Sequence, residues 1–179
     1  MRRRRVFEFF TGRGPAFGFG LEPANPHDFD PNLSGVFDRR VDTFNERIRN
    51  HACLIYRPNG KSVASYFWTS EPGAIVPLTP WINFVVPEGF TYIWDCKTDE
   101  RVRNRGYYTN GLREIMSERD CLISVEGNPS ARAAVVKAGF APIATIDTRN
   151  IGPVNIINGA VKFTGARISL SPPPATRLS

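Results

Sequence analysis

The residues best suited to chemistry form a short basic loop with one glycine, Arg103-Asn104-Arg105-Gly106-Tyr107-Tyr108. A strand-like run, Thr91–Lys97, precedes this loop, and a helix-like segment follows it. The first backbone N–H groups of a helix have no partner inside the helix, and the helix dipole favours an anion at that end. Arg103 and Arg105 add positive charge beside those amides, and Gly106 lets a ligand approach the backbone closely. The loop is therefore predicted to bind an anionic group such as a phosphate.

Composition limits the classes of protein to which this chain can belong. It has 179 residues, of which 41% are hydrophobic, and this predicts a single domain over residues 1–179 with a buried core. No apolar run approaches the roughly 20 residues that span a membrane, and the apolar stretch after the first arginines is too short for a secretion signal. We therefore expect a cytoplasmic protein without a membrane partner. Residues 1–4 and the proline-rich segment 171–179 are predicted to be flexible.

The charge distribution and the cysteine spacing limit the classes of ligand that the chain is expected to bind. The formal net charge is +6, and Arg101, Arg103 and Arg105 form its central cluster. The chain lacks a long basic stripe interleaved with aromatic residues, so a small phosphate-bearing ligand is favoured over nucleic acid. Its three cysteines are odd in number and widely spaced, which indicates reduced thiols and predicts no metal site.

Alternation and helical periodicity predict a mixed sheet with flanking helices. An amphipathic helix is expected from Ser34 to about Asn50, and a β-hairpin from Ala52–Arg57 and Ser62–Thr69. The proline-rich Ser70–Glu88 segment is expected to be a long connection with a short strand at Trp81–Val86. Further strands are predicted over residues 5–10, 91–97, 121–126, 140–148 and 160–170, and helices over residues 107–116 and 130–138. The Asn158-Gly159 pair suggests the turn that joins the last two strands as a hairpin.

Two motifs at a suitable separation resemble the signatures of the GNAT acetyltransferase superfamily. The family's phosphate loop, R/Q-x-x-G-x-G/A between its fourth strand and the following helix, is matched by Arg103 and Gly106. The second signature is an asparagine after the fifth strand and a short helix that ends in Gly-Phe, matched here by Asn128 and Gly139-Phe140. The resemblance covers about residues 92 to 140. It implies an α+β fold with three αβα layers around a central mixed, splayed, mostly antiparallel sheet of about six to seven strands.

The resemblance implies that acetyl-CoA, or another acyl-CoA, is the donor co-substrate. The loop amides would hold the pyrophosphate, and backbone groups near Cys96 and Thr98 would pair with the pantetheine arm as a pseudo-strand. Asn128 would bond that arm and Lys137 would approach a phosphate, with a plain helix cap and a solvated lysine as the alternatives. The expected cofactor-binding residues are Cys96, Thr98, Arg103, Asn104, Arg105, Gly106, Tyr107, Tyr108, Asn128, Ser130 and Lys137.

Two positions depart from the family pattern. Tyr108 stands where the family has a second small residue, so it either crowds the helix start or points aside into the core. Val135 occupies the position where many members have a tyrosine that protonates the leaving thiolate. A general acid must then come from water or from another side chain, the candidates being Tyr92, Tyr107, Tyr108 and Ser130.

The chemistry that the resemblance implies is direct attack of an amine on an acyl thioester in a ternary complex. A lysine-like amine has a pKa of ~10.4, so a base or a water relay must remove its proton at neutral pH. A backbone N–H near Cys96 would polarise the thioester carbonyl. Asp95 and Glu126 are the carboxylates closest to the expected splay, and with Tyr108 they are the candidate catalytic residues. An ordinary ion pair or turn contact is the alternative for each carboxylate, and a covalent role for Cys96 competes with that of a buried structural thiol.

The sequence thus favours an acyl-CoA-dependent N-acyltransferase that acts on a small-molecule or sugar amine. A non-catalytic domain of the same fold that binds a ligand or partner remains open, as does an acyltransferase with an acyl-carrier-protein donor. The acceptor is expected among Phe17–Gly20, the first helix and Ser70–Glu88, and a homodimer is left open.

Overall fold

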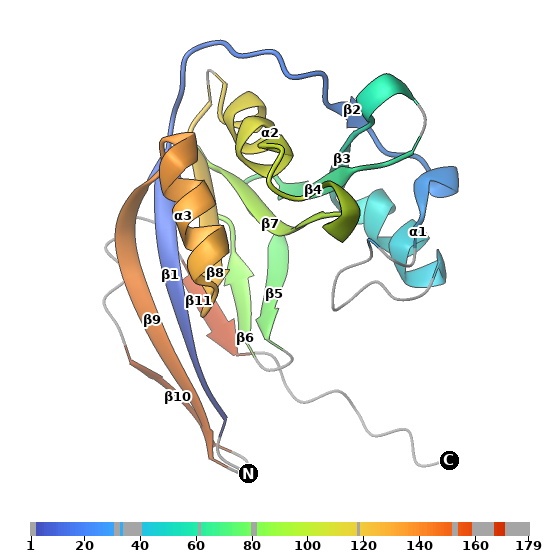
Figure 1. The fold of residues 1–179 in the computed structure, drawn as a ribbon. Helices are drawn as coiled ribbons and strands as arrows, with labels where there is room; N and C mark the ends of the chain where they lie inside the picture. Colours follow the sequence, from blue (N-terminus) through green and yellow to red (C-terminus); the bar gives the residue numbers. More distant parts are fainter. Residues whose placement is uncertain are drawn as a thin grey trace.

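The computed structural model describes residues 3–30, 33, 41–60, 62–79, 82–117, 119–151, 154–158 and 167–170, and an eight-stranded sheet lies at its centre (Figure 1). The strands lie in the order β10-β9-β1-β8-β7-β4-β3-β2. Only the β7–β8 pair is parallel, and every other neighbouring pair is antiparallel. Their bounds are β1 Arg3–Gly12, β2 Glu22–Pro23, β3 Ala52–Tyr56, β4 Ser65–Ser70, β7 Thr91–Thr98, β8 Cys121–Glu126, β9 Ala141–Ile151 and β10 Val154–Asn158.

A second sheet and three α-helices complete the described elements. The second sheet has the order β11-β6-β5 and is antiparallel. Its strands are β5 Ile75–Thr79, β6 Ile82–Val85 and β11 Arg167–Leu170. The helices are α1 Val41–Asn50, α2 Tyr107–Ile115 and α3 Pro129–Ala138, with the short 3-10 helices η1 Pro26–Asp28, η2 Pro58–Gly60 and η3 Glu100–Val102.

The central sheet separates two hydrophobic clusters, and this division places the site. On one face, which we call the α2/α3 face, Phe10, Phe67 and Ile123 pack against α2 and α3. On the other, which we call the α1 face, α1 and the β5–β6 hairpin cover the remaining large aromatic residues of the sheet. Alternate residues of a strand point to opposite faces, so each strand of the sheet supplies both clusters. In Figure 1, α2 and α3 lie side by side in front of the sheet.

Local signals explain why the helix after β8 begins and ends where it does. Asn128 is the N-cap of α3, and its side-chain oxygen accepts the Ala131 N–H at 3.0 Å. Pro129 follows at the first helical position, where its missing N–H has no intrahelical role. Gly139 then ends the helix with a φ of 112°, a left-handed conformation that favours glycine.

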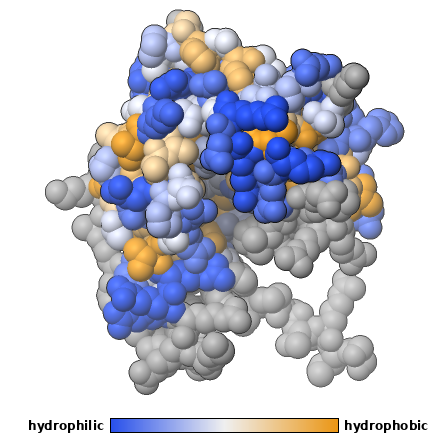
Figure 2. All heavy atoms as spheres, in the orientation of Figure 1, coloured by the Kyte–Doolittle hydropathy of each residue, from blue (hydrophilic) through white to orange (hydrophobic). Residues whose placement is uncertain are grey.

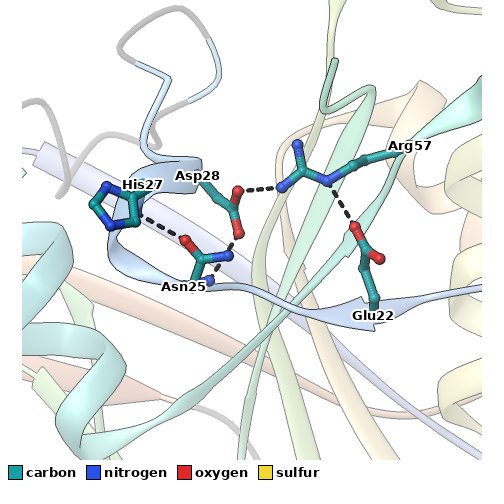
Figure 3. Close-up of polar contacts among 5 residues, drawn as sticks. All are labelled: Glu22, Asn25, His27, Asp28 and Arg57. Atoms are coloured by element: carbon teal, nitrogen blue, oxygen red, sulfur yellow. Dashed lines mark hydrogen bonds and ion pairs between the residues drawn. The ribbon is translucent and has the colours of Figure 1, made fainter. Parts of the chain in front are cut away.

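An arginine of the β3–β4 connection anchors the segment between β2 and α1. Arg57 donates to Glu22 at 2.6 Å and also to Asp28 of η1 (Figure 3). The η1 turn is closed by a capping box in which Asn25 accepts the His27 N–H at 2.9 Å. These bonds hold the sheet edge at β2 against the chain that leads to α1.

The predicted fold class is confirmed: the structure is mixed α+β with a mixed, mostly antiparallel sheet. The β3–β4 hairpin, α2, β8 and α3 lie where the sequence predicts them. The predicted helix from Ser34 is described from Val41 onward, and its expected N-cap, like residues 171–179, lies outside the described residues.

Two connections differ from the prediction. Ser70–Glu88 contains the predicted short strand as β6, but it also contains β5, and the two form a hairpin instead of a long connection. The strand β9 pairs with β1 and β10, whereas β11, the described part of the predicted Ala160–Leu170 strand, pairs with β6. The layer on the α1 face therefore combines a helix with a small sheet. Within the described residues, no helix is both long and apolar enough to cross a membrane.

Candidate functional site

The parallel strands β7 and β8 pair over three residues and then separate. The pairs run from Thr91↔Cys121 to Ile93↔Ile123, whereas β7 continues to Thr98 and β8 to Glu126. Backbone N–H and C=O groups that lose their ladder partner need another one. An extended ligand could enter this opening and pair with the backbone as an added strand.

A β-bulge in β7 accompanies the separation. Asp95 and Cys96 stand together opposite the single β4 residue Phe67, where the β4–β7 register shifts. Asp95 has a φ of 42°, which is uncommon for a residue with a side chain. Because a bulge bends its strand and increases the local twist, it turns the end of β7 away from β8.

A side-chain hydrogen bond marks the base of the opening on the α1 face. The Tyr92 hydroxyl lies 2.5 Å from Ser124 Oγ, which joins β7 to β8 at the end of their ladder. Burial raises the pKa of Tyr92, and the bond to Ser124 opposes that shift. The phenol is therefore neutral at pH 7 and acts as a hydrogen-bonding group.

The basic loop leads from β7 to an open helix start. Gly106 is the N-cap of α2 with a φ of 78°, and no side chain caps the helix there. Asn104 is also left-handed, with a φ of 65°. The first amides of α2 thus have neither an intrahelical partner nor a side-chain cap, as an anion site requires. Figure 2 shows hydrophilic residues gathered over η3 and this loop.

The arginines of the loop differ in their surroundings. Arg103 forms an exposed ion pair with Glu100 at 3.0 Å, and Arg101 pairs with Asp99. Arg105 is exposed and forms no ion pair within the described part of the chain. Exposed pairs of this kind are weak, so both Arg103 and Arg105 are available to an incoming anion.

The two tyrosines at the start of α2 point in different directions. Tyr108 packs on Phe67 at a ring distance of 5.9 Å, so its side chain faces the core and leaves the helix start uncrowded. Burial raises the pKa of Tyr108 well above its usual value, with a smaller contribution from Cys96. Tyr107 instead contacts Tyr56 at 5.0 Å and Phe19 at 6.2 Å.

The second motif is present at the start of α3. Asn128 caps the helix, which was its alternative interpretation, and Ser130 is exposed in the first turn. Lys137 is exposed on the last turn, and its carbonyl oxygen accepts a bond from Arg113 of α2 at 2.9 Å. Val135, at the family's tyrosine position, is fully buried and offers no acid.

The predicted carboxylates lie on opposite sides of the opening, and both form ion pairs. Asp95 binds Arg47 of α1 at 2.7 Å, and the pair is largely buried. Burial raises the pKa of Asp95, while the Arg47 charge opposes the shift. Glu126, at the end of β8, pairs with Arg5 at 3.2 Å and is 39% exposed. The structure therefore favours the ion-pair alternative for Asp95, and leaves Glu126 accessible at the surface.

The predicted arm-binding residues lie just past the bulge. Cys96 packs within the α2/α3 cluster, and burial raises the pKa of its thiol well above the usual value. A thiol that keeps its proton is a poor nucleophile, so the structural interpretation of Cys96 is favoured. The Thr98 hydroxyl bonds Ser65 at 2.9 Å across β4 and β7.

The predicted acceptor region is divided by the sheet. The Phe17–Gly20 segment lies on α2, where Glu114 accepts the backbone N–H groups of Phe19 at 2.6 Å, Gly20 at 2.8 Å and Leu21 at 3.2 Å. In contrast, α1 and the β5–β6 hairpin lie on the α1 face. The expectation that these segments form one site is therefore wrong for Phe17–Gly20.

A histidine that the sequence suggests is a capping or structural residue at the end of the first helix belongs to this region. His51 follows α1, and its Nδ1 lies 2.9 Å from Ser70 Oγ. Ser70 also accepts the indole N–H of Trp94 at 2.8 Å, and the imidazole packs edge-on to Trp94 at 5.1 Å. Burial and then the Arg47 charge lower the pKa of His51. No local sequence pattern predicts this network, because its members come from three separate elements.

Arg47 occupies an aromatic sandwich beside His51. Its guanidinium carbon lies 4.1 Å from the ring centre of Trp68 and 3.8 Å from that of Trp94. Burial lowers the pKa of Arg47, and the nearby carboxylate of Asp95 opposes the shift. This assembly fixes the position of the bulge against α1.

Known proteins were compared with the chain by sequence and by structure. No family model and no curated protein matches the sequence. Among solved structures, a protein described as an acetyltransferase of the GNAT family from Novosphingobium aromaticivorans is similar, with a TM-score of 0.54 and 15% identity over 81% of this chain. A Staphylococcus epidermidis protein of unknown function is similar with a TM-score of 0.51 and 9% identity over 82% of this chain.

These likenesses extend over part of the neighbours' length. The alignments cover 63% of the Novosphingobium chain and 60% of the Staphylococcus chain. At such identities the similarity shows the fold alone. The chain therefore has a GNAT-like fold, with the opening between β7 and β8 and the open start of α2 on its α2/α3 face.

Proposed function

We propose that this protein is an acyl-CoA-dependent N-acyltransferase that transfers an acyl group, most simply acetyl, to the amine of a small molecule or sugar. The observation that carries the proposal is the opening between β7 and β8 beside a helix start that is free of any cap. One feature suits an extended polar arm and the other suits a pyrophosphate, and CoA contains both groups. The fold likeness to a GNAT-family acetyltransferase supports the same assignment.

The donor would lie along the α2/α3 face. The amides of Gly106 to Thr109 would bind the pyrophosphate, with Arg103 and Arg105 adding charge. The arm would run beside Cys96 toward the bulge at Asp95, where the ladder with β8 has ended. The acyl group would then reach the sheet at the Tyr92–Ser124 bond.

The reaction is a direct transfer. The neutral amine nitrogen attacks the thioester carbonyl, the C–N bond forms, the C–S bond breaks, and the amine loses one proton as the thiolate leaves and gains one. Backbone N–H groups of the bulge are suited to stabilise the carbonyl oxygen as it becomes negative. Tyr108 keeps its proton, because burial raises its pKa, and it lies in the same cluster as Cys96, beside which the arm would run. Glu126 is an accessible carboxylate on the strand across the opening, suited to receive the amine proton through water.

A second candidate is a domain of this fold that binds an acyl-CoA without transferring the acyl group. Two observations favour it: Val135 is buried where the family's tyrosine would stand, and Asp95 is engaged by Arg47. The two candidates differ in turnover and agree in binding.

Thermal unfolding with acetyl-CoA tests the shared binding step. A ligand at about 100 times its dissociation constant stabilises the folded state by about 2.7 kcal/mol, so the melting temperature should rise. Gly106→Val should abolish the rise, because the side chain disturbs the left-handed turn that opens the helix start. Gly89→Val is the matched control: Gly89 has a φ of 81° and nothing within 4 Å of an added Cβ, so it carries a similar backbone strain elsewhere.

Thiol release from acetyl-CoA in the presence of a panel of amines separates the two candidates. Amine-dependent release establishes transfer. A melting shift with no release from any acyl-CoA would support the non-catalytic domain, and no shift with any acyl-CoA would refute both.

A further inference from the structure

A three-membered polar network lies on the α1 face at the point where β7 leaves β8. Trp94 is the first β7 residue beyond the last ladder pair, and its indole N–H donates to Ser70 Oγ at 2.8 Å. The same oxygen lies 2.9 Å from Nδ1 of His51. Ser70 is 2% and Trp94 7% exposed, whereas His51 is half-buried. The histidine is thus the member of the network that reaches the surface.

The hydrogen bonds favour one tautomer of the imidazole. An indole N–H can only donate, so Trp94 occupies a lone pair of Ser70 Oγ. The Ser70 hydroxyl hydrogen then has His51 Nδ1 as its acceptor among the described residues. A nitrogen that accepts is unprotonated, so neutral His51 carries its hydrogen on Nε2. Nε2 itself forms no bond within the described part of the chain.

The charges around the ring keep it neutral. Arg47 of α1 is the charged group closest to the imidazole, and Asp95 of β7 is paired with Arg47. Burial and the Arg47 charge lower the pKa of His51. Protonation of Nδ1 would also reverse its bond to Ser70 and leave the hydroxyl hydrogen without an acceptor. At pH 7 the ring is therefore a poor proton acceptor and a fixed donor at Nε2.

The position of His51 relates it to the acceptor. In the proposed function the donor occupies the α2/α3 face, where the helix start, Cys96 and Tyr108 lie. In that arrangement the amine would approach the thioester from the α1 face. His51 packs against Trp94, the first residue of the opening on that face.

We propose that His51 binds the acceptor substrate as a hydrogen-bond donor, its Nε2–H bonding an oxygen atom of that substrate. The inference rests on the proposed function and deepens it by naming the acceptor class. That class is an amine with a hydroxyl, carbonyl or carboxylate oxygen near the nitrogen, as in an aminosugar or an amino acid derivative. His51 is a positioning residue, and the proton of the amine leaves by another route.

The tautomer of His51 is tested by NMR without any ligand. The chain contains two histidines, His27 and His51, so ¹⁵N-histidine labelling gives two imidazole spin systems, and His27→Gln assigns them. We expect neutral His51 to show a pyridine-type Nδ1 and a protonated Nε2, and to titrate below the ordinary value of about 6.5. Ser70→Ala should populate the other tautomer. A wild-type ring with its proton on Nδ1, or one that titrates at or above 6.5, would overturn the proposal.

The acceptor class is tested with matched amines and acetyl-CoA. Glucosamine is compared with cyclohexylamine, and alaninamide with sec-butylamine, with each rate expressed per neutral amine because the oxygen-bearing members have the lower amine pKa. The wild type should prefer the oxygen-bearing member, and the pair with the larger preference identifies a sugar or an amino acid derivative. His51→Phe should reduce that preference about tenfold, the size of one hydrogen bond, mainly through KM.

His51→Gln separates a donor from a base. A glutamine amide donates a hydrogen bond but cannot take up a proton at neutral pH, so it should restore most of what His51→Phe loses, with an unchanged pH profile. Equal losses in the Gln and Phe variants, or no preference within either amine pair, would overturn the proposal. A protein that shows no melting shift with acetyl-CoA refutes the proposed function instead, and the NMR spectrum then decides the state of His51 by itself.

Discussion

The two faces of the central sheet are built by different means. On the α2/α3 face, aliphatic and aromatic side chains pack under two helices, and polar groups enter as backbone amides at the helix starts. On the α1 face, charged and polar side chains lie among tryptophans, with Arg47 between two indole rings and His51 beside it. The first arrangement leaves backbone groups open to a ligand. The second uses side chains to hold the bulge at Asp95 against α1.

The largest expected effect lies on the α1 face. Arg47→Met removes the cation from a buried pair and leaves Asp95 uncompensated, which should lower the free energy of unfolding by about 3–5 kcal/mol. Urea unfolding measures the change. The double variant Arg47→Met/Asp95→Asn should lose less than the single one, because it leaves no buried charge. A loss below about 1 kcal/mol in the single variant would show that the pair does not support the bulge.

A smaller effect is expected where α2 sits on the sheet. A Cβ at Gly111 would lie 2.2 Å from the Phe67 ring, so Gly111→Ala must displace the helix or the ring. Overpacking of this kind should lower the unfolding free energy by about 1–3 kcal/mol, despite the better helix propensity of alanine. Urea unfolding of Gly111→Ala and of the double variant Gly111→Ala/Phe67→Leu checks the cause, since the smaller side chain should recover part of the loss. An increase in stability would contradict the close contact between α2 and β4.

The smallest effect belongs to the exposed end of β8. Glu126→Gln breaks a pair with Arg5 that is open to solvent, so the unfolding free energy should change by less than about 1 kcal/mol. If Glu126 relays the amine proton, the same variant should still slow thiol release at neutral pH, where the amine is mostly protonated. If Glu126→Gln lost as much stability as Arg47→Met, Glu126 would be a structural carboxylate like Asp95. That result would contradict its assignment as an accessible group.

The α2/α3 face follows largely from local sequence signals, which is why the resemblance to the GNAT family locates it. Gly106 and Gly139 adopt left-handed conformations, and Asn128 caps a helix through a residue three positions away. Such signals act within one turn and are readable from a single sequence. The inward orientation of Tyr108 also follows, as one of two options, from the apolar face of α2.

The α1 face could not be predicted in the same way. Arg47 and Asp95 are 48 positions apart, and His51 and Ser70 are 19 positions apart, so no local residue spacing predicts either contact. The strand β5 contains Pro77, which lacks a ladder N–H, and it is tolerated because β5 is an edge strand of its sheet. The pairing of β9 with β10 was not predicted, because the sequence of β10 is equally compatible with part of a turn. Tertiary contacts, rather than local sequence signals, determine these features.

The central claim is that an acyl-CoA binds on the α2/α3 face, in the opening between β7 and β8. The most direct measurement is the change in backbone amide NMR signals when acetyl-CoA is added to the ¹⁵N-labelled protein. The account predicts the largest changes at the start of α2, from Gly106 to Thr109, and in β7 beyond Ile93, with small changes in the β5–β6 hairpin. Changes confined to the β5–β6 hairpin, or none at saturating acetyl-CoA, would contradict it.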